Sequence, residues 1–178
     1  MTVTRRSVLE AGGGFLACLV MGSAEAAAAA GDVVEIAMRG KADGSHVWFD
    51  PVGVLIRPGQ TIRWTNRDAG NSHTATAYHP AMFQRPRRIP VPAKPWDSDY
   101  LLPDESFSAV FTEPGVYDYY CVPHEQAGMV GRIVVGTQAK LEPHIAPTDP
   151  DLTPLPGAAL AGFPAVEEII AKGLVRRE

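Results

Sequence analysis

The segment from Cys121 to Met129 places a thiol, an imidazole and a thioether at Cys-x2-His-x4-Met spacing. It lies where one predicted strand ends and the next begins, so one tight loop can aim Cys121, His124 and Met129 at a single point. One further imidazole would complete a His2Cys site with a weak axial methionine, the ligand set of blue-copper electron-transfer centres. The spacing therefore predicts a type 1 copper site, with one copper ion per chain.

Copper explains this donor set better than zinc does. Thiolate and thioether sulfur suit Cu(I), while imidazole suits both oxidation states of copper. Zinc gains little from a thioether, and copper binds such ligands more tightly. We therefore expect one-electron cycling between Cu(I) and Cu(II).

The first 30 residues are typical of a twin-arginine (Tat) signal peptide. Arg5 and Arg6 precede an apolar run over residues 15–21, and small residues at 24–30 offer cleavage sites, with the cut expected within 26–30. The run is shorter than the roughly 20 residues that span a bilayer. The sequence predicts export, for example to the periplasm, without a stable membrane span. The residues before Cys18 match a lipobox poorly, so no lipid anchor is expected there.

Only two cysteines occur, Cys18 and Cys121, and the first would leave with the signal peptide. The exported chain then carries one thiol in a compartment that oxidises cysteines. Such a thiol is an oxidation hazard unless something occupies it. Metal binding by Cys121 would remove that hazard.

The composition predicts an all-β domain. Helix-forming runs are scarce, whereas Gly 17 and Pro 16 favour short strands joined by turns. A net charge of −4 argues against a nucleic-acid partner. Hydrophobic alternation predicts seven strands, near residues 34–38, 52–57, 60–66, 73–78, 107–111, 116–121 and 129–135.

This spacing predicts a β-sandwich of about seven to eight strands over residues 31–136. We expect residues 79–103 to be irregular because they contain many prolines. Residues 137–178 form a Pro-rich linker followed by an irregular or helical extension. A short helix is predicted over 165–172, where Val166, Ile169 and Ile170 share one face.

The run from Tyr117 to His124, followed by residues 127–131, resembles the copper loop of the plastocyanin-like cupredoxins. The resemblance covers residues 32–136 and is strongest in the last 25 of them. It implies a Greek-key, cupredoxin-like β-sandwich with copper at one end, and an exported carrier of single electrons between two redox proteins.

The second imidazole has four candidates besides His124: His46, His73, His79 and His144. The family takes this ligand from a loop that follows a strand carrying Trp-x-Asn, and here Trp64 and Asn66 precede His73 in that way. The resemblance therefore implies His73. Many relatives carry Asn after this histidine and use it to tie the two ligand loops together, whereas this chain has Thr74.

The resemblance also implies where electrons enter and leave. His124, with Pro123 beside it, would form the main port at the solvent edge. Alternation places Tyr117 and Tyr119 in the core and Tyr120 towards solvent, where it could serve a second route. A basic cluster of Arg85, Arg87 and Arg88 suggests a partner with an acidic surface.

Two other functions compete with electron transfer. A copper carrier or chaperone would bind the same metal, although such proteins usually favour exposed Met- or His-rich sites. A copper oxidase or nitrite reductase needs further histidine clusters, and the spare histidines here are isolated. We therefore predict that the chain is not an enzyme.

Overall fold

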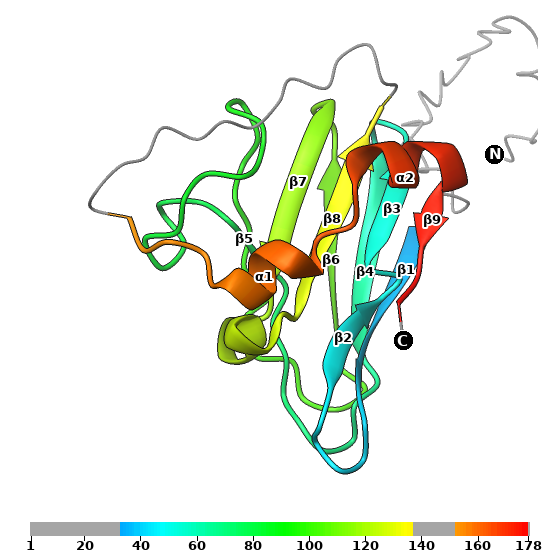
Figure 1. Ribbon diagram of the computed structural model, residues 1–178. Helices are drawn as coiled ribbons and strands as arrows, with labels where there is room; N and C mark the ends of the chain where they lie inside the picture. The colour runs from blue at the N-terminus through cyan, green and yellow to red at the C-terminus, as the bar shows by residue number, and fades with distance from the viewer. Residues whose placement is uncertain (1–32, 137–151, 178) are drawn as a thin grey trace, which may run out of the picture. The chain divides into compact units, whose positions relative to one another are not determined.

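The computed structural model describes residues 33–136 and 152–177, which form two β-sheets and two short helices (Figure 1). The predicted signal peptide, with Cys18, and residues 137–151, with His144, lie outside the described residues.

The first sheet has four strands in the order β2-β1-β4-β6. Strand β1 runs parallel to β4, whereas β2 and β6 pair antiparallel with their neighbours. The strands are β1 Val33–Gly40, β2 Val47–Asp50, β4 Gln60–Asn66 and β6 Ser106–Phe111.

The second sheet has five strands in the order β5-β7-β8-β3-β9. Strand β3 runs parallel to β8, and the other pairs are antiparallel. The strands are β3 Gly53–Ile56, β5 Thr76–Ala77, β7 Gly115–Tyr120, β8 Val130–Val135 and β9 Leu174–Val175.

One hydrophobic core joins the two sheets. Ile62 and Trp64 of β4 are fully buried, while Arg63 between them is exposed, as their alternation predicts. The Trp64 ring packs edge-on against Tyr119 of β7, with ring centroids 5.4 Å apart. Burial of a large apolar side chain contributes about 1.5–3 kcal/mol, so these inward positions hold the sandwich together.

The turn between β3 and β4 follows the chemistry predicted for Pro58-Gly59. Gly59 has φ +90°, and the N–H of Gln60 donates to the carbonyl of Arg57 at 3.1 Å. A positive φ at the third turn residue favours glycine. This turn lies at the end of the sandwich opposite Asn66, the last residue of β4.

The predicted strand over residues 73–78 is shorter than expected. Regular pairing is limited to β5, and His73 pairs instead with Leu101 in an isolated bridge. The Pro-rich segment 79–103 is largely irregular, as predicted, but it returns to Thr76 through a bridge with Asp97. The Pro-rich segment thus supplies, through these isolated bridges, the backbone pairing that a longer strand would otherwise provide.

The C-terminal segment packs on the outer face of the second sheet. Helix α1 (Gly157–Gly162) contacts β8, and helix α2 (Val166–Lys172) contacts β3 and β8 (Figure 1). The helix predicted over 165–172 is confirmed as α2, whereas α1, β2 and β9 were not predicted. Because α2 is too short to be stable alone, its packing on the sheet stabilises it.

The prediction that Tyr120 faces solvent is wrong. Its side chain is only 1% exposed and lies in a cluster with Tyr78, Val130 and Ala159. The alternation of β7 assumed one solvated face, as in many antiparallel sheets. Tyr78, Ala159 of α1 and the arginines paired with Asp118 cover that face, so the side chains on both faces of β7 are buried.

The packing of α2 predicts a large effect of Ile169→Ala on stability. Ile169 is fully buried against Val52, Val134 and Val175. Its truncation should lower the free energy of unfolding by about 2–5 kcal/mol in a denaturant titration. Leu160→Ala, at a 54% exposed position of α1, should change it by about 0.5 kcal/mol or less. Equal effects would contradict the docking of α2.

Candidate metal centre

A short helical loop places Cys121, His124 and Met129 close together. Cys121 follows β7 directly, and the 3-10 helix η1 (Val122–Ala127) carries His124. The N–H of Cys121 donates to the carbonyl of Met129 at 3.0 Å, and the N–H of Met129 donates to that of His124 at 3.2 Å. Gly128 reverses the chain with φ +82°. The loop therefore closes on itself and returns Met129, fully buried, beside Cys121.

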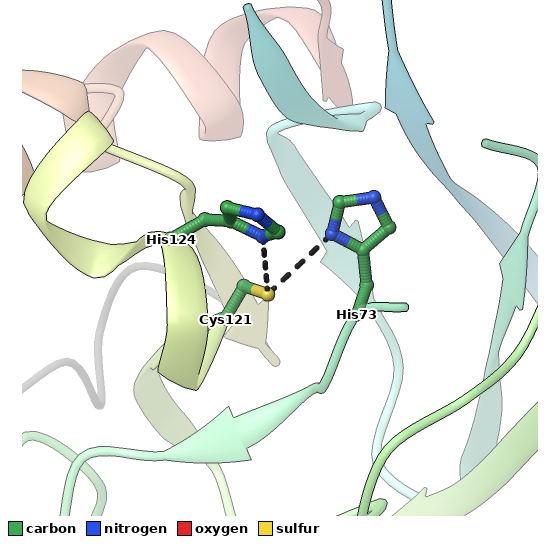
Figure 2. A group of neighbouring side chains, drawn as sticks. All are labelled: His73, Cys121 and His124. Atoms are coloured by element: carbon green, nitrogen blue, oxygen red, sulfur yellow. Dashed lines mark hydrogen bonds between the residues drawn. The ribbon is translucent and has the colours of Figure 1, made fainter. Parts of the chain in front are cut away.

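The two imidazoles lie side by side and both point a ring nitrogen at the thiol, as Figure 2 shows. Cys121 Sγ lies 3.5 Å from His73 Nδ1 and 3.4 Å from His124 Nδ1. One ligand atom from each of the three residues lies within 4.8 Å of the others. The structure thus brings His73 together with the loop, as the resemblance implied.

The loop after β4 is held in place by Asn66. Its side-chain amide donates to the carbonyls of Asn71 and Leu101, at 2.8 and 2.9 Å. His73 and Leu101 then exchange two backbone hydrogen bonds. These contacts direct the fully buried His73 towards Cys121. The other described histidines, His46 and His79, lie outside this group.

Thr74 connects the His73 loop to the Cys121 loop. Its backbone N–H donates to Cys121 Sγ at 3.3 Å, and its hydroxyl accepts a 2.9 Å hydrogen bond from the N–H of Val122. The same hydroxyl contacts Thr76, which donates to the Asp97 carboxylate. Thr74 thus ties the two ligand loops together through both its backbone N–H and its hydroxyl.

Sequence patterns did not identify Asp68 as a residue of the site. Its Oδ2 lies 3.0 Å from His73 Nε2, and its side chain is 5% exposed. Burial alone would raise the pKa of this carboxyl. Hydrogen bonds from Asn71, Gly70 and His73 outweigh it, so the pKa lies below that of an ordinary aspartate. Aspartate spaced five residues from a ligand has no known sequence signature, so only the folded loop reveals the contact.

Burial controls the protonation of all three converging side chains. It raises the pKa of the Cys121 thiol to about 11, although the Thr74 N–H opposes this. Burial lowers the pKa of His73, and the nearby Asp68 opposes this shift only in part. Burial also lowers the pKa of His124, and the positive charge of a protonated His73 would lower it further. Neutral imidazoles offer lone pairs at pH 7, while the thiol needs a cation to displace its proton. Soft sulfur and imidazole donors in a buried pocket fit copper.

The predicted electron port is only partly at the surface. Pro123 is exposed and His124 is half-buried, so the ring of His124 reaches the solvent edge. Tyr120, the third residue predicted for this surface, is buried under α1 and cannot contact a partner directly.

Two of the three arginines predicted to face an acidic partner make internal ion pairs. Arg85 pairs with the buried Glu125 and lies over the Tyr120 ring, 5.7 Å from its centroid. Arg88 pairs with the buried Asp118 at 2.7 Å. Their charges offset buried carboxylates, which leaves Arg87 as the member of the cluster without such an assigned internal role.

Comparison with known proteins matches this chain to copper-binding proteins. Residues 36–136 match the copper-binding proteins of the plastocyanin/azurin family. The chain is 35% identical to the chloroplastic plastocyanin of Oryza sativa subsp. indica over 134 residues, which are 75% of this chain and 81% of that protein. It is 39% identical to the chloroplastic plastocyanin of Tetradesmus obliquus over 95 residues, 53% of this chain and 62% of that protein.

Among solved structures, a Sinorhizobium pseudoazurin aligns with a TM-score of 0.49 and 26% identity, covering 78% of this chain and 94% of that one. No helix among the described residues is long and apolar enough to cross a membrane. The match over 36–136 includes both ligand loops described above. The chain is a member of the plastocyanin/azurin family of copper-binding proteins.

Proposed function

We propose that this protein carries single electrons between redox partners on one type 1 copper ion. The ligands would be His73, Cys121, His124 and Met129. The observation that carries the proposal is the convergence of two imidazole Nδ1 atoms on the buried Cys121 sulfur. Bound copper would supply the one-electron Cu(I)/Cu(II) couple.

The protein's own contribution is a rigid ligand set. Cys121 would bind as the strong thiolate ligand, the two imidazoles as equatorial ligands and Met129 as the weak axial ligand. Thr74 and the backbone bonds within the loop hold these residues before metal binds. A site that moves little between oxidation states favours fast electron transfer.

Electrons would enter and leave at the His124 end. His124 is half-buried beside the exposed Pro123 and Ala127, so a partner can approach the imidazole closely. The burial of Tyr120 argues against a second route through its face. A contribution of Arg87 to binding an acidic partner stays a prediction, and the partners themselves are redox proteins of unassigned identity.

Export and the absence of catalysis are further parts of the proposal. The twin arginines Arg5 and Arg6 support a Tat route to the periplasm or an equivalent compartment. Among the described residues, His73, Cys121 and His124 form the one group of His, Cys, Asp or Glu with metal-binding spacing. One such centre supports an electron carrier rather than an oxidase or nitrite reductase.

Copper binding is tested by adding Cu(II) to the purified protein and recording its visible spectrum. We expect an intense thiolate-dependent colour that disappears in Cys121→Ser and returns after each cycle of reduction and reoxidation. A colourless wild type, or colour that survives in Cys121→Ser, would show that the thiol does not bind copper. Loss of copper upon reduction would favour the carrier or chaperone alternative.

Thr74→Val tests the connection between the two ligand loops. Valine keeps the shape but leaves the Val122 N–H without its acceptor, so the free energy of unfolding should fall by about 1–3 kcal/mol. The copper absorption should shift in the same variant. Thr74→Ser keeps the hydroxyl, and its spectrum should match the wild type. Equal spectra for Thr74→Val and the wild type would show that this hydroxyl does not influence the copper site.

The electron port is tested by exchange between oxidised and reduced copies of the protein. Ala127→Glu adds charge at the exposed edge beside His124, so like-charge repulsion should slow self-exchange at least several-fold at low salt. Val110→Glu adds the same charge at the other end of the sandwich, since Val110 pairs with Thr61 near the start of β4. It should leave the rate nearly unchanged. A larger effect of Val110→Glu would place the port elsewhere.

A further inference from the structure

We propose that Asp68 is a positioning residue for the copper centre, holding His73 in one tautomer and favouring Cu(II) over Cu(I). The proposal rests on the proposed function, because it assigns a role at the same site. It concerns a residue that neither the copper-loop spacing nor the resemblance identified.

The contact between Asp68 and His73 selects the tautomer. Asp68 Oδ2 lies 3.0 Å from Nε2, and an ionised carboxylate only accepts hydrogen bonds. Nε2 therefore carries the proton, which leaves a lone pair on Nδ1. That atom is the one 3.5 Å from the Cys121 sulfur. The carboxylate thus presents the correct nitrogen to a metal.

The carboxylate is held independently of His73. The Asn71 side-chain amide donates to Oδ2 at 2.8 Å, and the Gly70 N–H donates to Oδ1 at 2.9 Å. The Asp68 N–H donates in turn to the Asn66 side chain at 2.9 Å. The backbone of the turn uses only Oδ1, whereas Oδ2 contacts both the Asn71 amide and the His73 ring. This division argues for a role beyond closing the turn.

The last residue of β1 provides the space for this carboxylate. A Cβ added at Gly40 would overlap the Asp68 carboxylate, with Oδ2 as its nearest atom. The Asp68 carboxylate therefore occupies the space that the Cβ of any other residue at position 40 would need. Strand β1 and the loop after β4 together confine Asp68 beside His73.

A buried negative charge next to a copper ligand acts on the two oxidation states unequally. It attracts Cu(II) more strongly than Cu(I), and the interaction is strong because both groups are shielded from water. It also makes the imidazole a stronger donor, as carboxylates behind metal-bound histidines do. Asp68 should therefore lower the reduction potential relative to a neutral residue at the same position.

Three substitutions separate the charge, the hydrogen bond and the position of this group. Asp68→Asn removes the charge and keeps an acceptor, and Asp68→Ala removes both. Gly40→Ala keeps the charge but displaces the carboxylate. The control is Asp104→Asn, which removes the same charge from an exposed aspartate paired with Arg67.

We expect Asp68→Asn to bind Cu(II) about 10–100-fold more weakly than the wild type, with a smaller loss for Cu(I). Each tenfold difference between the two losses raises the reduction potential by about 59 mV. Gly40→Ala should raise the potential in the same direction, and Asp104→Asn should not. An Asp68→Asn potential equal to that of the wild type or of Asp104→Asn would overturn the charge effect.

The tautomer is measured in the metal-free protein by long-range 1H–15N correlation of the His73 ring. The wild type should carry its proton on Nε2, and Asp68→Ala should show a mixture of tautomers. A wild-type proton on Nδ1, or no change in Asp68→Ala, would overturn the positioning role without any copper. Failure of the proposed function would instead appear as a wild type without thiolate-dependent colour. The two failures are therefore distinguishable. If Asp68→Ala does not fold, Gly40→Ala, which displaces the carboxylate, replaces it in the tautomer measurement.

Discussion

The copper site depends on one connection between two loops that are distant in sequence. Thr74 donates its backbone N–H to the Cys121 sulfur and accepts, at its hydroxyl, the N–H of Val122. Leu101 and Asn66 position the His73 loop, but the strand pairing that would join it to the Cys121 loop, between β5 and β7, is only two residues long. The cost of burying these polar groups is offset only when each finds its partner. This short network of hydrogen bonds thus joins the two ligand loops, as a longer pair of strands would in its absence.

The second sheet is buried on both faces, and this requires more than hydrophobic packing. The β7 residue Asp118 is buried and pairs with Arg88 and Arg132, while Glu125 in the copper loop pairs with Arg85. Both arginines from the Pro-rich segment therefore stabilise buried carboxylates. Buried carboxylates without such partners would be strongly destabilising. Arg85 and Arg88 therefore belong to the internal packing, a role that charge patterning in the sequence could not distinguish from that of a binding surface.

Sequence patterns predicted the sandwich and the copper loop because both depend on short-range rules. Alternation located β4, β6, β7 and β8 closely, and the spacing from Cys121 to Met129 needed only one loop. What failed depended on distant contacts. The exposure of Tyr120 was wrong since α1 covers it, and the role of Asp68 depends on Gly40 and Asn71, which no periodicity connects to it. His73 falls between these two cases, because the spacing left four candidates and only the family resemblance selected it.

The two histidines of the site have different environments, and the difference suits an electron carrier. His73 is fully buried, and the Asp68 carboxylate on its far side prevents it from turning. His124 is half-buried and lies on a helical turn that exposes Pro123 and Ala127. One imidazole can therefore set the electronic properties of the metal while the other transmits electrons. With Tyr120 buried, electron exchange in the proposed carrier would be concentrated at the His124 end, whereas Asp68, the group proposed to tune the copper, contacts the other imidazole.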